Sequence, residues 1–519
     1  MPELTPKLGI KKPLGNETVS RASFNENWDI IDQNTQKNII QSATAPSTPV
    51  IDDLWIDIST SPYGFKKWDG SAWQKIGAVV PEDIGAVAQT DFDSHLAETV
   101  IKTDITINVP SDYTTVQEAL DSLKYAWIPR DVTVTIQVAA GTYTHTSSIV
   151  INHPCGSQIQ IVGATPITTT ITGVGTISGS AGAWSVPIKV ASAVGAQVGQ
   201  YAIIRNTTGT GDHYAFQGIW EITAVDTGTN TVTVKNTYRG DVFPTATLSG
   251  GDFIVLTTIL KFTDCIGLRV FDKALGYLNQ VAIVGNNSAS TTAGIEVGHS
   301  NWFNVRGGTV YCGDYVGVSG FTYGFVTGNG GSVIGKYLSA CNNHSGFYAL
   351  QCGSIYGNNS ISNGNSSVGI TASFSSIVHA YTSIVCGNGG YGVLVEYSSS
   401  VHVSSSKIIG NLSHGVYLNH TSSGTFYTAI VSRNGVHGVY AVDGSAAYVA
   451  NCTAENNVSV GFYALFSGVI YAAQSTASGN GTDYKAEKMG YIYCGGYVGT
   501  PTFSPALNTE GNYNAIITT

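Results

Sequence analysis

The feature that most constrains this sequence is a 23-residue repeat in its C-terminal half. Six glycines from Gly346 to Gly461 stand 23 residues apart, and each opens a short apolar word such as GVYLN or GVYAV. Six asparagines from Asn365 to Asn480 keep the same spacing, and Asn343 extends their column backwards across a rung one residue shorter. A fixed period of about 20–50 residues is typical of a solenoid, in which each unit buries its apolar face only against its neighbours.

Each unit also carries the signals of β-structure. Between the glycine and asparagine columns lie two further strand-like words, such as TFYTAI and AAYVAN, and no unit shows a helical period. Three short strands and three bends per turn predict an all-β parallel β-helix with 23-residue rungs. In a word such as GVYL, we expect Val and Leu to point inward and Tyr outward. The asparagines should lie at a sharp bend, because Asn tolerates the left-handed backbone conformation. Stacked about 4.8 Å apart, their amides can hydrogen-bond from rung to rung.

Composition narrows the function. Of 519 residues only 11% are charged and 43% are hydrophobic, while 61 glycines and 28 tyrosines favour all-β structure over a disordered chain. The net charge of −10 and the lack of a Lys/Arg run argue against a nucleic-acid partner and favour a neutral, hydroxyl-rich ligand. No run of 18 apolar residues and no apolar signal core appear. We therefore expect the chain to be assembled in a cytoplasm and not to insert into a membrane.

The eight cysteines are scattered without a C-x-x-C pair. We therefore interpret them as small buried apolar residues rather than disulfide partners or metal ligands, and nothing in the sequence requires a metal or another cofactor. They are Cys155, Cys265, Cys312, Cys341, Cys352, Cys386, Cys452 and Cys494.

Outside the repeat, the chain changes character several times. Residues 20–40 and 90–101 have helical patterns, and three tryptophans in residues 53–77 mark a small hairpin unit, either as its core or as a surface that stacks on sugars. Residues 212–214 and Trp220 are interpreted as structural, with a ligand contact as the alternative. We expect a helical attachment segment (1–50), a hairpin unit (51–80), a helical neck (81–103), the first part of the β-helix with a capping helix (104–175), a β-barrel-like insertion (176–257), the main parallel β-helix (258–488) and a C-terminal β segment (489–519).

Several short patterns carry a family resemblance. Residues 113–120 read Y-T-T-V-Q-E-A-L, residues 134–143 fit V-x-I-x-V-x-x-G-x-Y, and residues 159–163 fit I-x-I-x-G. This order resembles the start of the pectin-lyase-like right-handed β-helix superfamily, and within it phage tail fibres and tailspikes. The segments NENWDIID (25–32) and SPALNTEGNYNAIIT (504–518) also resemble phage tail proteins. The paired Gln and Asp segments of pectin methylesterases are not found.

The resemblance implies a right-handed β-helix in a homotrimer. It also implies attachment to a phage baseplate or tail protein through the N-terminus, and a virion tail that is assembled in the host cytoplasm and acts outside it. The implied ligand is a cell-surface polysaccharide, which some members of the superfamily cleave. Two alternatives stay open: a monomeric polysaccharide lyase or glycoside hydrolase of the same superfamily, and a structural fibre that binds no glycan.

The repeat also aligns outward-pointing aromatic residues into columns. One column holds Tyr348, Thr371, Leu394, Tyr417, Tyr440 and Tyr463, and another, eight residues later, runs from Tyr356 through His379 and His402 to Tyr471. Aromatic rings stack on the apolar C–H faces of sugars, but they also suit contacts between the chains of a trimer, and both interpretations stay open. The predicted glycan-binding residues are Tyr348, Tyr417, Tyr440, Tyr463 and His402.

Carboxylates are scarce on the repeat. Glu396 and Asp443 occupy neighbouring columns two rungs apart, about 9.6 Å along the axis, which is near the separation that inverting glycoside hydrolysis needs. They are the predicted catalytic pair, with two merely solvated carboxylates as the alternative. Glu455 and Arg433 are expected to form a surface ion pair with little effect on stability.

Overall fold

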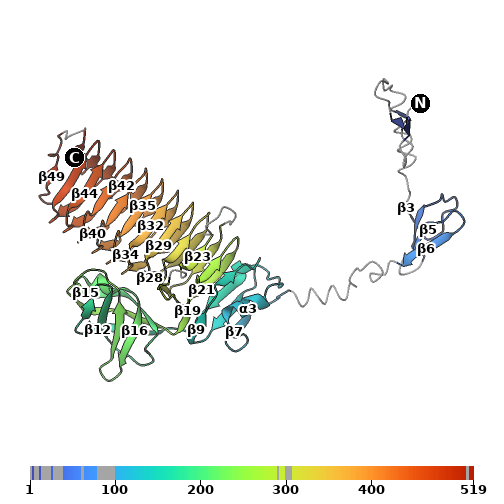
Figure 1. The fold of residues 1–519 in the computed structure, drawn as a ribbon, viewed down its shortest axis with the longest axis horizontal. Helices are drawn as coiled ribbons and strands as arrows, with labels where there is room; N and C mark the ends of the chain where they lie inside the picture. The colour runs from blue at the N-terminus through green and yellow to red at the C-terminus, as the bar shows by residue number, and fades with distance from the viewer. Residues whose placement is uncertain are drawn as a thin grey trace. The chain divides into compact units, whose positions relative to one another are not determined.

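The computed structural model describes residues 3–4, 11–12, 25–26, 39–59, 64–78, 100–288, 292–298, 307–509 and 514–519. The chain divides into two compact units, Met1–Thr99 and Val100–Thr519. The second unit holds a long parallel β-helix and an antiparallel barrel that lies beside it (Figure 1). The repeat therefore gives the predicted all-β solenoid.

Three parallel sheets form the β-helix, and consecutive rungs pair in the register of the repeat. Tyr417 pairs with Tyr440, and Tyr440 pairs with Tyr463. Sheet A contains the strands that follow the glycine column. Its described strands are β10 (Ile149–Ile151), β20 (Leu268–Val270), β23 (Ala293–Val297), β26 (Tyr323–Thr327), β29 (Ser345–Leu350), β32 (Val368–Ser373), β35 (Val393–Glu396), β38 (Val416–Leu418), β41 (Val439–Ala441), β44 (Val460–Leu465), β47 (Thr482–Glu487) and β49 (Phe503–Ser504).

Sheet B follows sheet A on each rung and extends to both ends of the solenoid. Its described strands are β7 (Ile105–Val109), β8 (Val134–Val138), β11 (Ile159–Val162), β21 (Ala274–Asn279), β24 (Thr309–Cys312), β27 (Ser332–Lys336), β30 (Ser354–Asn358), β33 (Ile377–His379), β36 (Ser400–His402), β39 (Ser423–Thr425), β42 (Ala446–Tyr448), β45 (Val469–Tyr471), β48 (Tyr491–Tyr493) and β50 (Ile516–Thr518).

Sheet C completes each rung and leads into the asparagine column. Its described strands are β9 (Gly141–His145), β19 (Thr258–Phe262), β22 (Val281–Val284), β25 (Val316–Ser319), β28 (Ser339–Cys341), β31 (Ile361–Asn363), β34 (Ile384–Cys386), β37 (Lys407–Ile409), β40 (Ile430–Ser432), β43 (Thr453–Glu455) and β46 (Thr476–Ser478).

The asparagine column is a buried hydrogen-bonded ladder between sheets C and A. From Asn365 to Asn480, each Nδ2 donates to the Oδ1 of the next asparagine at 2.8–3.0 Å, as predicted. The predicted left-handed backbone at these residues is wrong. The left-handed residue is the preceding one, such as Gly387 (φ 59°) or Asn456 (φ 56°). The bend is therefore made one residue earlier, and the amide of the ladder asparagine points into the solenoid.

The glycine column packs against this ladder and against the carbonyl oxygen of the next glycine in the column, which would lie 2.6 Å from a Cβ on Gly438. A Cβ on Gly415 would lie 2.6 Å from the Nδ2 of Asn434, and one on Gly438 would lie 2.8 Å from the Nδ2 of Asn457. Such distances are well inside van der Waals contact, so a side chain here would displace the ladder amide. The two most regular columns of the sequence thus pack against each other. As predicted, Val416 and Leu418 point into the core and Tyr417 points out.

A helix caps the N-terminal end of the solenoid core. It is α3 (Val116–Ser122), and the Thr115 side chain caps it by accepting a hydrogen bond from the Glu118 backbone N–H at 3.1 Å. Val116, Ala119 and Leu120 are buried on the face that contacts β7, β8 and β10. The predicted capping helix is present.

The insertion is an antiparallel barrel. Six strands close in the order β12, β18, β15, β16, β17, β14, because β12 pairs with both β14 and β18, and β13 extends the sheet beyond β14. Trp220, Phe216 and Phe253 are fully buried in the core, so Trp220 does not face a ligand. The elements are β12 (Ile167–Val174), β13 (Ser178–Ser180), β14 (Ala183–Val190), β15 (Tyr201–Gly211), η3 (His213–Phe216), β16 (Gly218–Asp226), β17 (Thr231–Asn236) and β18 (Ala246–Leu256).

The barrel packs on the outer face of sheet C. The Ile219 backbone N–H donates to the Cys341 sulfur at 3.4 Å, and the Asn363 side chain donates to the Gln217 carbonyl at 2.7 Å. The Tyr238 ring lies so close to Gly387 that a Cβ there would be 2.1 Å from the ring. Glycine at this left-handed position therefore allows the barrel to approach.

Arg433 also joins the two parts of this unit. Its guanidinium forms an ion pair with Asp212, at the start of η3. The predicted ion pair between Arg433 and Glu455 is wrong, because sequence spacing places Glu455 on the next rung but says nothing of the barrel. The two residues share a backbone hydrogen bond instead, from the Arg433 N–H to the Glu455 carbonyl at 3.0 Å.

In the N-terminal unit, β3 (Ile39–Ser42), β4 (Leu54–Asp57), β5 (Gly64–Trp68) and β6 (Trp73–Ala78) form one sheet, and β1 (Glu3–Leu4) pairs with β2 (Lys11–Lys12). The Trp73 ring packs edge-on against Trp55 and Trp68, each at 5.5 Å between centroids, and Trp55 is buried. The tryptophans thus form the core of the hairpin unit. Of the two predicted helical segments, residues 25–26 are helical, and almost all the other residues lie outside the described part of the chain.

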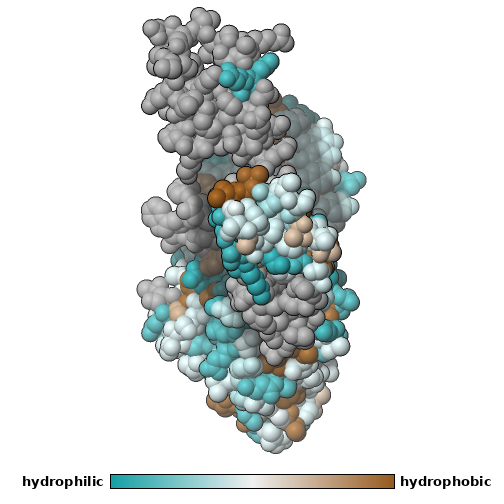
Figure 2. All heavy atoms as spheres, turned by 90° about the vertical axis from the view of Figure 1, so that its right-hand side faces the viewer, coloured by the Kyte–Doolittle hydropathy of each residue, from teal (hydrophilic) through white to brown (hydrophobic). Residues whose placement is uncertain are grey.

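All eight cysteines have free thiols, and six of them are buried as predicted. Cys265 is partly exposed, and the prediction is wrong for the exposed Cys352, which lies in a bend between sheets A and B. On the face drawn in Figure 2, hydrophobic residues lie in small groups among hydrophilic and neutral ones. None of the helices in the described residues is long and apolar enough to span a membrane.

Candidate functional site: a ring wall on sheet A

Six aromatic side chains form two adjacent columns on the outer face of sheet A. We call this group the ring wall. The Tyr417, Tyr440 and Tyr463 rings stack at 5.1 and 4.8 Å between centroids, and their planes are 18° and 10° apart. Beside them, His414 stacks on Tyr391 at 5.5 Å and on His437 at 4.9 Å. The ring wall therefore consists of Tyr391, His414, His437, Tyr417, Tyr440 and Tyr463.

The histidines tie the wall to the backbone of the solenoid. The His437 backbone N–H donates to Nδ1 of His414 at 3.3 Å, and the Val460 N–H donates to Nδ1 of His437 at 3.2 Å. Burial lowers the pKa of both imidazoles to about 4. At neutral pH both rings are uncharged, and since Nδ1 accepts, the proton is on Nε2. Each histidine thus offers an Nε2–H donor at a fixed position.

Charged groups border the C-terminal end of the wall. The Tyr463 hydroxyl donates to Oε2 of Glu487 at 2.5 Å, and the Lys485 ammonium lies 5.1 Å from the Tyr463 ring centroid. The hydrogen bond from Tyr463 lowers the pKa of Glu487. Tyr463 is buried, whereas the other five wall residues are partly exposed. The wall therefore ends in a polar, ionised edge.

The two candidate catalytic carboxylates lie next to the wall. Glu396 ends β35, and Asp443 follows β41 in the bend, in the next column and two rungs further along, as the spacing predicts. Burial raises the pKa of Tyr417, and the charges of Tyr391, Asp443 and Glu396 raise it further. Both carboxylates thus raise the pKa of the Tyr417 hydroxyl through their negative charge. Burial also raises the pKa of Glu396, an effect that His420 opposes.

A second, exposed stack runs along the bend between sheets A and B. Phe374, Tyr397 and His420 stack at 4.6 and 4.5 Å between centroids, all with a left-handed backbone (φ 51–54°). Asp443 occupies the next position of the same column with φ 52°. Large side chains seldom adopt this conformation, which costs about 1–2 kcal/mol per residue. The stack brings aromatic surface to the side of the wall where the carboxylates lie.

Sheet B carries a separate ladder that includes His402. The His379 ring stacks on Tyr356 at 5.0 Å and on His402 at 4.6 Å, and Tyr471 stacks on Tyr448 at 5.0 Å. Thr425 separates the two stacks. Tyr381 lies beside His379 and His402, with ring centroids 6.1 and 6.4 Å away, so this ladder is also two rings wide at that point.

The five predicted glycan-binding residues are thus only partly brought together. Tyr417, Tyr440 and Tyr463 share the wall, whereas Tyr348 stacks on Tyr323 at 4.7 Å, separated from the wall by Thr371 and Leu394 in its column. His402 lies on another sheet. Sequence reasoning missed the column of Tyr391, His414 and His437. Its signal was present, because each of these residues directly precedes a column glycine, as in the repeated word HGVY.

No group of three or more His, Cys, Asp and Glu side chains that could hold a metal ion occurs in the described residues. The wall instead offers ring faces, hydroxyls, two imidazole N–H groups and carboxylates. Such a surface can stack on an apolar ring face and exchange hydrogen bonds with hydroxyl groups.

Comparison with known proteins identifies the fold. Residues 323–480 match the family model of the right-handed β-helix region. The matched residues are under a third of the chain and include the whole ring wall. The β-helix is therefore right-handed, as the resemblance implied. No curated protein sequence matches this chain.

Several solved structures are similar to this chain at low identity and with low TM-scores. The tailspike protein gp49 from Pseudomonas phage LKA1 is 13% identical, with 76% of each chain covered and a TM-score of 0.34. The A-module of the mannuronan C-5 epimerase AlgE6 from Azotobacter vinelandii is 14% identical over 79% of this chain and 96% of the other, with a TM-score of 0.44. The Gp54 tailspike of Acinetobacter baumannii bacteriophage AP22, in complex with a capsular saccharide of A. baumannii, is 10% identical over 80% and 77%, with a TM-score of 0.20. These similarities concern the fold alone.

Proposed function

We propose that this protein binds a cell-surface polysaccharide through the ring wall on sheet A. The observation that carries the proposal is the double column of stacked rings, with a tyrosine spacing of 4.8–5.1 Å along the solenoid. Sugars present apolar C–H faces that stack on aromatic rings, and several aligned rings provide a continuous platform for a polymer. The two Nε2–H groups and the tyrosine hydroxyls then bind the sugar hydroxyls.

The proposed setting is a virion tail. We infer that three copies form the spike, that residues 1–50 attach it to a baseplate or tail protein, and that the β-helix acts outside the host cell. The support is the resemblance of residues 25–32, 113–163 and 504–518 to phage tail proteins, together with the match to the right-handed β-helix family. Sedimentation equilibrium tests the assembly. A mass near three times 54.4 kDa supports it, and a 54.4 kDa monomer favours a free-standing polysaccharide-binding protein or enzyme.

Binding itself is tested with the full chain and a panel of capsular polysaccharides and lipopolysaccharides from different bacteria, for example by biolayer interferometry. The proposal expects submillimolar binding to at least one of them. If the chain binds none, the interpretation as a structural fibre is favoured. The ring wall would then be better explained as a contact between copies.

Cleavage of the bound polymer is a second proposal, supported by one observation. Burial raises the pKa of Glu396, as a general acid requires, and Asp443 lies in the next column two rungs further along. The double variant Glu396→Gln, Asp443→Asn should stop the release of reducing ends and leave binding within about threefold. Unchanged cleavage by this variant would exclude the pair.

A further inference from the structure

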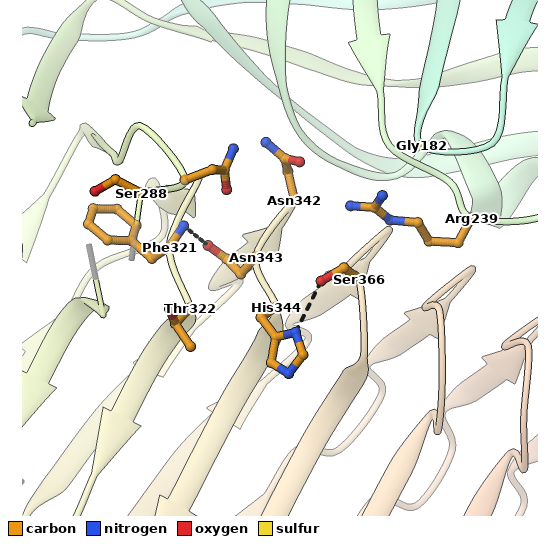
Figure 3. Close-up of a pocket in the computed structure, with 10 residues that line it drawn as sticks. Gly182, Arg239, Ser288, Phe321, Thr322, Asn342, Asn343, His344 and Ser366 are labelled. Carbon is orange, nitrogen blue, oxygen red and sulfur yellow. Dashed lines mark hydrogen bonds between the residues drawn. The ribbon is translucent and has the colours of Figure 1, made fainter. Parts of the chain in front are cut away.

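A cavity lies where the barrel meets the solenoid. It is about one rung from the N-terminal end of the ring wall, because the backbone N–H of Gly369, three residues after Ser366, donates to the Tyr391 carbonyl at 3.0 Å. It has a volume of about 400 Å³, within the rough range of 300–1,000 Å³ for small-molecule sites. Gly182 and Arg239 line it from the barrel side, and Asn342, His344 and Ser366 line it from the bends that lead into sheet A. In Figure 3, Arg239 points from the barrel toward these solenoid residues.

Two hydrogen bonds and one close packing contact fix Arg239. Its Nε donates to the Gly364 carbonyl at 3.1 Å, and its backbone N–H donates to the Gly387 carbonyl at 3.0 Å. Its Nη1 lies against Gly182, where a Cβ would be only 2.5 Å away. The side chain is thus held at its base, and the outer edge of the guanidinium faces the cavity (Figure 3).

The charge of Arg239 is not neutralised by a carboxylate. Arg205, Arg269 and Arg433 each form an ion pair with a carboxylate, whereas in the described part of the chain no Asp or Glu oxygen lies within 4.0 Å of Arg239. The Arg239 side chain is partly buried, and this burial lowers its pKa. A partly buried cation without a counter-charge attracts an anion, and the planar guanidinium fork matches the oxygens of a carboxylate or a phosphate.

The solenoid side of the cavity supplies neutral hydrogen-bonding groups. Nδ1 of His344 and Oγ of Ser366 lie 3.2 Å apart, and the Asn342 amide stands between them and the barrel (Figure 3). Thr322 adds a further hydroxyl. One cation among amides and hydroxyls suits a ligand that carries one negative group and several hydroxyls.

We propose that this cavity binds an acidic sugar, with the sugar carboxylate on Arg239 and its hydroxyls on Asn342, His344 and Ser366. The choice of a sugar as the carrier of the carboxylate rests on the proposed polysaccharide binding. The requirement for a negative group follows from Arg239 alone.

The test is isothermal titration of the full-length protein with trisaccharides of glucuronate, galacturonate and mannuronate, and with their methyl esters as uncharged controls. At least one acid should bind, and its ester at least tenfold more weakly. Arg239→Ala should weaken binding of the acid at least tenfold, and Gly182→Ala should also weaken it by displacing the guanidinium. Lys189→Ala is the control. It removes an exposed positive charge from β14, the strand that follows Gly182, and should leave the affinity for the acid unchanged.

Three results would overturn the proposal: no binding of any acid, equal affinity for acid and ester, or unchanged binding by Arg239→Ala. Binding of inorganic phosphate but of no uronate would overturn the assignment to a sugar. If Arg239→Ala unfolds the barrel, Gly182→Ala and the methyl esters still test whether the cavity binds the sugar carboxylate. Tyr440→Ala separates the two sites, because it should weaken binding of the long polysaccharide and leave the trisaccharide titration unchanged. A failure of the ring wall and a failure of this cavity are therefore distinguishable.

Discussion

The outward residues of the repeat differ between sheets C and A: those on sheet C are covered by the barrel, and those on sheet A reach solvent. On sheet C, the outward side chains of Cys341, Ile361, Cys386 and Ile409 are at most 3% exposed, because the barrel of the same chain packs on them. On sheet A, the outward positions carry tyrosines and histidines whose ring faces stack along the solenoid and whose polar edges reach solvent. Where the barrel covers the solenoid, the outward residues are small or apolar, and along the ring wall, where their edges reach solvent, they are aromatic.

The difference separates stability from function. Substitutions under the barrel should reduce the free energy of unfolding, whereas substitutions in the ring wall should reduce ligand binding at little cost in stability. The asparagine ladder lies between the two faces and supports both. The predictions below test this separation, in order of expected effect.

Asn411→Ala should destabilise the protein most. The backbone N–H and Nδ2 of Asn388 would lose the Oδ1 acceptor of Asn411, and the Val385 carbonyl would lose its donor, all in a buried position. Unsatisfied buried groups cost about 1–3 kcal/mol each, so we expect a loss of about 3–5 kcal/mol in the free energy of unfolding, measured by urea denaturation. Asn419→Ala, in a half-exposed position, should cost under about 1 kcal/mol. Equal losses for the two variants would contradict the ladder.

Gly387→Ala should separate the barrel from sheet C. The new Cβ would lie 2.1 Å from the Tyr238 ring, and the backbone has a left-handed φ of 59°. Overpacking and the left-handed conformation together should cost about 2–4 kcal/mol. Gly330→Ala is the matched control, since its φ is 78° but its Cβ would meet open space. Hydrogen exchange should show loss of protection in the barrel for Gly387→Ala alone, and a barrel that keeps its protection would refute this contact.

Tyr440→Ala should weaken polysaccharide binding about tenfold, equivalent to about 1.4 kcal/mol, because it removes the central ring of the tyrosine column. Its cost in stability should be about 1 kcal/mol, since the side chain is partly exposed. Thermal unfolding and binding are measured on the same preparation. A large loss of stability with unchanged affinity would reverse the roles assigned to the two faces.

Acid should loosen the ring wall. The unfolded chain protonates His414 and His437 near their ordinary pKa of 6.5, but the folded chain protonates them only near 4. Their contribution to stability is therefore complete above pH 6.5 and is lost progressively as the pH falls to about 4. A protonated Nδ1 also cannot accept the backbone N–H it now binds. The variant His414→Asn, His437→Asn should lose less stability than the wild-type protein between pH 6.5 and 4, by about 1–2 kcal/mol after solvent screening. Identical pH profiles would contradict the buried neutral imidazoles.

Periodicity decided what could be predicted from the sequence. The rung register, the inward Val416 and Leu418, the outward Tyr417 and the amide ladder all follow from the 23-residue spacing. The partners of Arg433 and Gly387 do not, because Asp212 and Tyr238 come from an insertion more than 100 residues earlier, which has no period in common with the solenoid. The histidine column had a periodic signal, but its place beside the tyrosines depends on how the rings turn at the bend.

The most direct test of the central claim is the affinity of three full-length proteins for a polysaccharide that the wild-type chain binds. One variant carries Tyr417→Ala and Tyr440→Ala on sheet A, and the other carries Tyr448→Ala and Tyr471→Ala, an equivalent stacked pair on sheet B. We predict that the sheet A variant loses affinity at least 30-fold (about 2 kcal/mol) while the sheet B variant stays within threefold of the wild type. Equal affinities for all three proteins, or a loss confined to the sheet B variant, would contradict the ring wall as the binding surface.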